Sequence, residues 1–283
     1  TEALMRLLDG RNNPCGHLPD TWPVEYFDQP SSVNFFNFTE VAERPMQTDD
    51  PYWAQVCYEE GAYVGYRYFE SFGKKVAFPF GFGLSYTTFS YKPVRFIADS
   101  EHIELTVRVQ NTGTYPGKAV LQLYASKPND RLEHPLCEMV AFGKTELLAP
   151  GQEAMLALTA RTNDLASYDE KAAAWMLLQG RYAFSFGENA AARCEIGELR
   201  FTEDQIVQQV KNRVCPQIPV HELSREDRSV SRKDTGMFTE RPFAPIRVAD
   251  PAPVVPAAPE KPLYFEDVMA DPDLAEVFVA QYT

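Results

Sequence analysis

Apolar and polar residues alternate through the middle of the chain, from about residue 86 to residue 201. Ile103, Leu105, Val107 and Val109 are each followed by a polar residue, which is the pattern of a strand with one buried and one wet face. Turn-forming residues separate this stretch from further expected strands at residues 119–124, 139–148, 153–160, 173–178 and 182–186. About seven short strands with this spacing predict a mainly β chain built around an immunoglobulin-like antiparallel sandwich.

The residues before this sandwich follow a different pattern. Leu4, Leu7 and Leu8 share one face of a short expected helix that ends near Gly10. Aromatic rings with interleaved glycines crowd residues 58–89. Because aromatic side chains bury large areas, we expect this stretch to form a packed seam between domains. The alternative for the same rings is a platform on which sugars stack.

Beyond residue 201 the composition changes again. A helix is expected over residues 203–214, followed at 216–262 by a proline-rich, charged stretch that is typical of a semi-rigid linker. Apolar residues return at near-helical spacing in 263–283, where we expect a short helical segment that begins another domain. The expected domains are therefore residues 1–85, 86–201, 202–262 and 263–283.

The charge balance and the cysteines limit the partners and the setting of the chain. Its 283 residues carry 27 Lys and Arg against 40 Asp and Glu, a formal net charge of -13, which disfavours nucleic acid and anionic membrane surfaces. No apolar run approaches the roughly 18 residues that span a bilayer. An odd number of scattered cysteines indicates a reducing, cytoplasmic setting. They are Cys15, Cys57, Cys137, Cys194 and Cys215.

Three motifs resemble the C-terminal part of glycoside hydrolase family 3 enzymes, the beta-glucosidases and their relatives. They are Asn-Pro-Cys-Gly-His-Leu-Pro at 13–19, Glu-Gly-Ala-Tyr-Val-Gly-Tyr-Arg-Tyr at 60–68 and Phe-Pro-Phe-Gly-Phe-Gly-Leu-Ser-Tyr-Thr-Thr-Phe at 78–89. Cys15 and His17 stand where the family usually carries Ser and Arg. The family's usual polar contacts at this turn are therefore not carried over to this chain.

The resemblance runs from about residue 3 to about residue 200 and implies an order of domains. Residues 1–85 resemble the end of the family's α/β sandwich domain, and residues 86–201 resemble its fibronectin type III-like domain. Residues 265–281 are similar to the start of the catalytic barrel. This order occurs in a minority of the family, which usually places the barrel first. Since the chain begins at Thr1 and ends within a helical pattern, we expect a piece of a longer protein.

The resemblance also implies where the catalytic groups lie. Retaining glycosidases use two carboxyl groups roughly 5 Å apart, a nucleophile and an acid/base. In this family the nucleophilic Asp is on the barrel, and the acid/base Glu lies in the α/β domain before residue 13. Both positions fall outside this sequence, so we expect no catalytic residue, no metal and no cofactor in it. The implied substrate of the whole enzyme is a beta-glucoside or oligosaccharide, although the family also includes beta-xylosidases and N-acetyl-beta-glucosaminidases.

The remaining candidate chemistry is weak. Glu59 with Glu60, and Asp49 with Asp50, are sequence neighbours whose side chains would point to opposite faces of an extended chain. Ser85 lacks the final glycine of a nucleophile elbow. The histidines show no metal-ligand spacing. They are His17, His102, His134 and His221.

Two functions remain open from the sequence. In the first, the chain is a structural, accessory part of a beta-glucosidase-like enzyme, and residues 1–85 are poorly anchored without the domain on which they pack. In the second, it is a stand-alone immunoglobulin-like module that binds carbohydrate or adheres. Exposure of four rings would favour the second function, and their burial would count against it. These rings are Tyr63, Tyr66, Tyr68 and Phe69.

Overall fold

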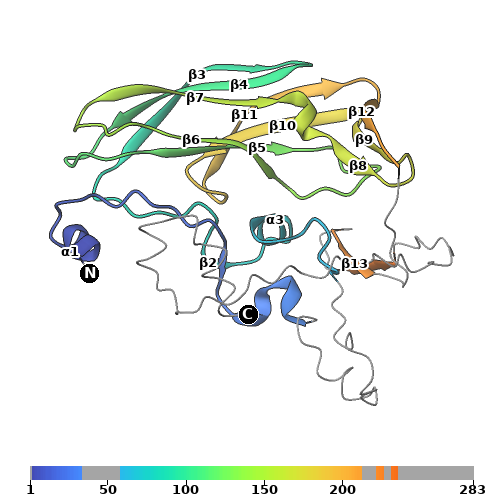
Figure 1. Cartoon of the computed structure of the whole chain (residues 1–283), viewed down its shortest axis with the longest axis horizontal. Coiled ribbons are helices and arrows are strands. Elements are labelled where there is room, and N and C mark those ends of the chain that lie inside the picture. The colour runs from blue at the N-terminus through green and yellow to red at the C-terminus, as the bar shows by residue number, and fades with distance from the viewer. Residues whose placement is uncertain (1, 34–57, 212–220, 226–230, 235–283) are drawn as a thin grey trace, which may run out of the picture. The chain divides into compact units, whose positions relative to one another are not determined.

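Two antiparallel sheets form the centre of the chain (Figure 1). The computed structural model describes residues 2–33, 58–211, 221–225 and 231–234. One sheet has the order β3-β4-β7 and the other the order β11-β10-β5-β6. Their bounds are Phe89–Ala98 for β3, His102–Asn111 for β4, Val120–Ser126 for β5, Glu138–Lys144 for β6, Glu153–Arg161 for β7, Gly180–Gly187 for β10 and Arg193–Phe201 for β11. The expected antiparallel sandwich is confirmed.

The core lies between these sheets because each strand turns its apolar face inward. Ile103, Leu105 and Val107 of β4 are fully buried, as are Leu123 of β5 and Phe184 of β10. Burying one such side chain contributes about 1.5 to 3 kcal/mol. The apolar residues of the alternating stretch 103–109 are therefore the ones that face the core.

A third, smaller sheet corrects one expectation. It has the order β12-β9-β8, with β8 at Ser167–Asp169, β9 at Ala174–Leu177 and β12 at Gln205–Gln209. The helix expected over residues 203–214 is therefore wrong, since β12 pairs antiparallel with β9. The β-branched Ile206 and Val207 suit a strand, and β9 offers an edge on which they can pair.

The chain before the sandwich consists of short elements. They are α1 (Glu2–Leu8), β1 (Trp22–Pro23), the 3-10 turns η1 (Tyr26–Asp28) and η2 (Pro30–Val33), α3 (Tyr66–Ser71) and β2 (Val76–Phe78). The expected first helix is confirmed as α1, and Gly10 follows it with φ of 76°. Another 3-10 turn, η3 (Thr162–Leu165), follows β7. Within the described residues, no helix is long and apolar enough to cross a membrane.

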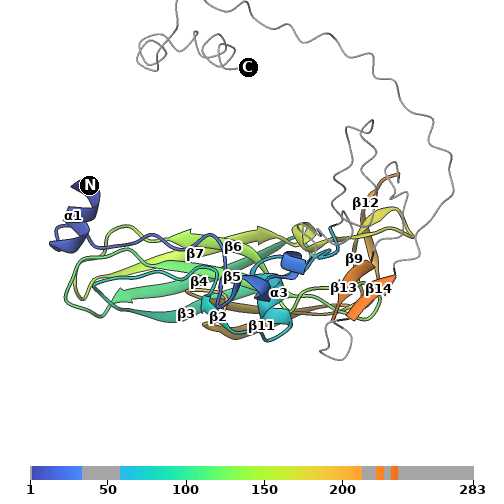
Figure 2. The same cartoon turned by 90° about the horizontal axis from the view of Figure 1, so that it is seen from below.

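Beyond β12, the next described residues form a hairpin. Strands β13 (His221–Ser224) and β14 (Ser231–Asp234) pair antiparallel, so the linker expected over residues 216–262 is wrong for these eight positions. Figure 1 shows β13 on the same side of the sandwich as α3, and Figure 2 shows β13 and β14 side by side. The short helical segment expected at 263–283 lies outside the described residues.

Candidate functional site

The three motifs before the sandwich come together in one junction. Leu18 donates its N–H to the carbonyl of Phe82 at 2.8 Å and accepts the N–H of Gly81 at 2.9 Å. The amide of Asn13 donates to the carbonyl of Pro116 at 2.9 Å and accepts the N–H of Tyr86 at 2.8 Å. Motif 13–19 is thus held by motif 78–89 and by the sandwich together.

The aromatic rings of motif 60–68 and its neighbourhood are closed off from solvent. Tyr63, Tyr68 and Phe69 are 2%, 6% and 3% exposed. The half-buried Tyr66 ring stacks on Phe80, with centroids 4.8 Å apart, and contacts Tyr124 of β5 edge-on at 5.9 Å. Its hydroxyl accepts the N–H of Met139 in β6 at 2.8 Å. Tyr66 and Phe80 form a seam against the sandwich, whereas the three buried rings pack with Leu223. The burial of these rings counts against a platform on which sugars stack.

The seam also corrects the expectation that residues 1–85 are poorly anchored. That expectation is wrong for α3, whose Tyr66 ring contacts Tyr124 of the four-stranded sheet and whose Ser71 accepts the N–H of Leu136 at 2.8 Å. It fits α1 better, since Leu4 and Leu8 are 58% and 69% exposed. The difference follows from the partners that each segment finds within the described residues.

Of the two acidic pairs, the structure describes Glu59 and Glu60. Glu59 and Glu60 lie in the turn before α3, where their carbonyls accept the N–H groups of Leu223 and Tyr63. Asp49 and Asp50 lie outside the described residues. Through these two hydrogen bonds, the backbone carbonyls of Glu59 and Glu60 help to hold Leu223 and Tyr63 in place.

The described histidine side chains belong to different parts of the fold. His102 is exposed at the start of β4, with Nδ1 3.2 Å from Oδ1 of Asp99. His134 is buried, and burial lowers its pKa. His17 lies in the junction, while the side chain of His221 lies outside the described residues. In the described part of the chain, no group of three His, Cys, Asp or Glu side chains is placed to hold a metal ion.

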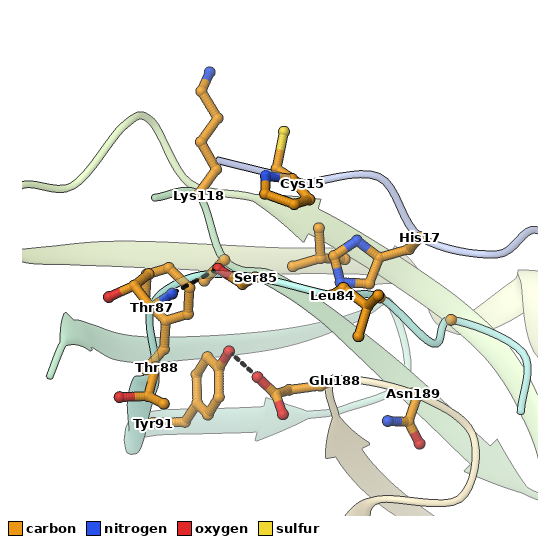
Figure 3. Close-up of a pocket in the computed structure, with 16 residues that line it drawn as sticks. Cys15, His17, Leu84, Ser85, Thr87, Thr88, Tyr91, Lys118, Glu188 and Asn189 are labelled. Atoms are coloured by element: carbon orange, nitrogen blue, oxygen red, sulfur yellow. Dashed lines mark hydrogen bonds between the residues drawn. The ribbon is translucent and has the colours of Figure 1, made fainter. Parts of the chain in front are cut away.

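A cavity of about 300 Å³ opens beside the junction. Figure 3 shows Cys15 and His17 on one side of it and the pair of Tyr91 and Glu188 on the other. The Tyr91 hydroxyl donates to Oε1 of Glu188 at 2.5 Å. Burial raises the pKa of Tyr91, and the neighbouring carboxylate raises it further. This hydroxyl therefore remains a hydrogen-bond donor across the range in which proteins work.

Cys15 and His17, which the resemblance places where the family usually carries Ser and Arg, line this cavity. The carbonyl of Cys15 accepts a hydrogen bond from Lys144 Nζ at 2.6 Å. This contact uses the backbone of Cys15, so it does not depend on which side chain stands at position 15. Burial lowers the pKa of His17, and the nearby Lys144 lowers it further. The lowered pKa favours the neutral imidazole, whereas the Arg that the resemblance implies at this position in the family would carry a charge.

The cavity lacks the groups that glycoside hydrolysis needs. Glu188 is the single carboxylate among its lining residues, whereas a retaining glycosidase uses two, about 5 Å apart. Ser85 also lines it, but its hydroxyl donates to Asn13 and accepts from the N–H of Thr87. The described residues thus bring together a packed junction with a small polar cavity. Sequence reasoning did not identify Tyr91 or Glu188, because 97 residues separate them.

Comparison with known proteins assigns a class to the sandwich and then a family to the chain. The fibronectin type III-like domain family matches residues 119–190, within the expected domain at 86–201. A beta-glucosidase of Ruminococcus albus is 34% identical over 236 residues, which cover 81% of this chain and 23% of that protein. Beta-glucosidase A of Butyrivibrio fibrisolvens is 37% identical, covering 76% of this chain and 27% of that protein.

Solved structures extend the likeness over most of the chain. A beta-glucosidase from Paenibacillus barengoltzii has a TM-score of 0.74 at 30% identity, covering 99% of this chain and 31% of that one. Bifidobacterium adolescentis GH3 beta-glucosidase has a TM-score of 0.62 at 25% identity, covering 76% of this chain and 30% of that one. The chain is a beta-glucosidase-like region of glycoside hydrolase family 3. It spans about a quarter of the length of the curated relatives it matches, 23% and 27%.

Proposed function

We propose that this chain is the structural, accessory region of a retaining beta-glucosidase, in which it braces the domains that carry the catalytic groups. The observation that carries the proposal is the buried seam, in which rings from before the sandwich pack on β5 and β6. Such contacts hold the segment before the sandwich against β5 and β6. The proposed substrate of the whole enzyme is a beta-glucoside, the class in the names of the relatives.

Exposed apolar residues support a bracing role. Trp22, Phe27 and Leu84 are 55%, 77% and 68% exposed. Trp22 contacts the ring of Phe78, itself 39% exposed, with centroids 6.1 Å apart. Exposed apolar patches commonly mark interaction sites. We assign these residues to the contact with the upstream α/β domain.

The proposed division of labour leaves the isolated chain inactive. The nucleophile is assigned to a downstream barrel and the acid/base to the upstream α/β domain. Removing either role from a retaining glycosidase removes most of its rate enhancement. Glu188 alone in the cavity provides one carboxylate without a second among the lining residues.

The test compares the isolated chain with a version extended by the flanking coding sequence on both sides. The extended protein should hydrolyse p-nitrophenyl beta-glucoside, and the isolated chain should not. Turnover by the isolated chain that disappears in Glu188→Gln or Glu60→Gln would place a catalytic site within these residues. An extended protein without a barrel, or without glycosidase activity, would contradict the proposed function.

A further inference from the structure

One carboxylate, that of Glu133, joins the chain that enters the sandwich to the chain that leaves it. Glu133 lies in the loop between β5 and β6. Its Oε1 accepts the hydroxyl of Tyr63 at 2.6 Å and also the backbone N–H of Arg225. Its Oε2 accepts the hydroxyl of Ser224 at 2.8 Å. Tyr63 precedes the sandwich and Ser224 follows it, so a single side chain holds both segments.

Apolar packing joins the same two segments independently of the carboxylate. Leu223 of β13 is 8% exposed and belongs to one apolar cluster with Tyr63, Tyr68 and Phe69. Its N–H donates to the carbonyl of Glu59 at 2.8 Å. The segment that leaves the sandwich therefore completes the core of the segment that enters it. We call this arrangement, Glu133 with Tyr63, Leu223 and Ser224, the latch.

Two of the polar groups that Glu133 binds are buried, while Glu133 itself is half-buried. Tyr63 is 2% exposed and Ser224 is fully buried. Burial raises the pKa of Tyr63, and its hydrogen bond to Glu133 raises it further. The phenol therefore stays a donor. Removing the carboxylate would leave the Tyr63 hydroxyl without this acceptor in a site largely closed to water, which is costly.

The loop that carries Glu133 is itself held at several points. The ring of buried His134 bonds to the carbonyl of Pro128 at 2.5 Å and to Oγ of Ser167 at 2.8 Å. Arg131 pairs with Asp169 and Asp204. Glu133 thus projects from a fixed base on the sandwich. Because the loop is held in place, the carboxylate of Glu133 can fix the positions of the two segments that bind it.

We propose that Glu133 is a positioning residue that sets, through the latch, the distance between the upstream and downstream parts of the enzyme. This step rests on the proposed function, in which the acid/base enters from the N-terminal side and the nucleophile from the C-terminal side. Because the two carboxyl groups must lie about 5 Å apart, opening the latch would disturb their alignment. Glu133 acts at a distance and contacts no substrate.

Hydrogen exchange on the 283-residue chain tests the latch itself. In Glu133→Gln, amides 222–225 and 59–63 should exchange about tenfold faster or more, while amides 103–109 of β4 keep their protection. Glu153→Gln is the matched control, since Glu153 is exposed and its carboxylate lies 3.7 Å from Arg108. Unchanged exchange at 222–225, or equal acceleration throughout β4, would overturn the latch. Tyr63→Phe and Ser224→Ala each remove one hydroxyl and should give smaller, separate increases.

Leaving-group dependence in the extended enzyme tests the positioning role. A misplaced acid/base hinders substrates with poor leaving groups most, because these need protonation as the bond breaks. Glu133→Gln should lower kcat/KM for phenyl beta-glucoside about tenfold and for 2,4-dinitrophenyl beta-glucoside less than about threefold. No loss, or equal loss for both substrates, would overturn positioning while leaving the proposed function intact. If the extended wild type hydrolyses neither substrate, the proposed function fails and the exchange experiment still decides the latch.

Discussion

Arg193 Nη1 lies 2.8 Å from Oε2 of Glu70, which ties the start of β11 to α3. The two side chains are 15% and 20% exposed, so water screens this ion pair only weakly. The guanidinium also lies over the ring of Tyr124, 5.7 Å from its centroid. One arginine of the sandwich therefore contacts both a charge on the incoming helix and a ring of the core strand β5.

Breaking this ion pair should loosen the seam. Glu70→Ala leaves the largely buried guanidinium of Arg193 without a carboxylate partner, although the carbonyl of Ala190 still accepts from it. The variant should lower the free energy of unfolding by about 2 to 3 kcal/mol. Urea unfolding measures the loss. Glu146→Ala is the control, because Glu146 is 95% exposed and lies 3.5 Å from Lys118. An exposed pair of that kind is worth less than about 1 kcal/mol. Equal losses in the two variants would contradict a buried role for Glu70.

Gly81 should tolerate alanine less well than Gly151, although both have left-handed backbones with φ of 84° and 78°. A Cβ at Gly81 would lie 2.7 Å from the side-chain amide of Gln122. A Cβ at Gly151 would have no heavy atom within 4 Å among the described residues. Gln122 is 5% exposed and accepts the Tyr124 hydroxyl at 2.6 Å, so it has little room to move. Gly151→Ala should cost about 1 kcal/mol from backbone strain.

The clash at Gly81 adds to that strain. Overpacking a filled site typically costs about 1 to 3 kcal/mol, so Gly81→Ala should lose at least about 1 kcal/mol more than Gly151→Ala. Urea midpoints of the two variants, measured side by side, give the difference. Identical midpoints would mean that motif 78–89 does not press on β5 as the structure describes.

The strands of the sandwich were predictable where burial has a local signature. β4 buries every second residue, so the alternation in its sequence is enough to predict a strand without knowing which strands pair with it. β3 was not identified individually because Pro93 interrupts its pattern. It is an edge strand, where a proline can be accommodated, and its register shifts between Pro93 and Arg95. The misassigned β12 shows the converse case, since a distant partner, β9, decides its conformation.

The seam was partly predictable and the latch was not. Dense rings with interleaved glycines indicated burial, and the burial of Tyr63 bears this out. Glu133 and Ser224 are 91 residues apart, and neither belongs to a motif. These polar residues form a contact only because the fold brings distant parts of the chain together. No local sequence pattern predicts such a contact.

Asn111 should be among the least replaceable polar residues of the sandwich. It is fully buried, and its Nδ2 donates to the carbonyls of Tyr115 at 2.7 Å and Leu148 at 2.9 Å. Its Oδ1 accepts the hydroxyl of Thr87 at 2.6 Å and the N–H of Gly113 at 3.1 Å. Each buried group left without a partner costs about 1 to 3 kcal/mol. Asn111→Ala should therefore lower the free energy of unfolding by at least about 2 kcal/mol.

Asn111→Asp separates hydrogen bonding from size. A carboxylate would face two carbonyls, so burial and repulsion should raise its folded pKa. A raised folded pKa means that the folded state holds the proton more tightly, and the penalty relative to wild type should shrink as pH falls from about 7 to 5. Urea unfolding at several pH values measures this trend. Asn163→Asp, in the exposed turn after β7, is the control. A penalty independent of pH would contradict the buried amide network.

Stability should fall in mild acid because His134 is buried in its neutral form. Burial is the main cause of its lowered pKa, and Lys127 lowers it further, while the carboxylates of Glu138 and Glu133 act in the opposite direction. With the folded pKa below the ordinary value of 6.5, the unfolded chain binds the proton more readily. This contribution is fully present above the ordinary pKa and is lost as pH falls through 6.5 toward the folded value.

His134→Asn should therefore flatten the dependence of unfolding free energy on pH between about 7.5 and 5.5. His17, whose pKa burial also lowers, titrates in the same direction and should account for part of the slope that remains. Carboxylates with lowered pKa, such as Asp169, act below this window because their ordinary value is 3.8. His102→Asn removes an exposed imidazole and serves as the control. Since His134 anchors the loop that carries Glu133, protonation at this position should also accelerate exchange at amides 222–225. A slope in His134→Asn as steep as in wild type would show that this ring is not the group whose charging weakens the fold.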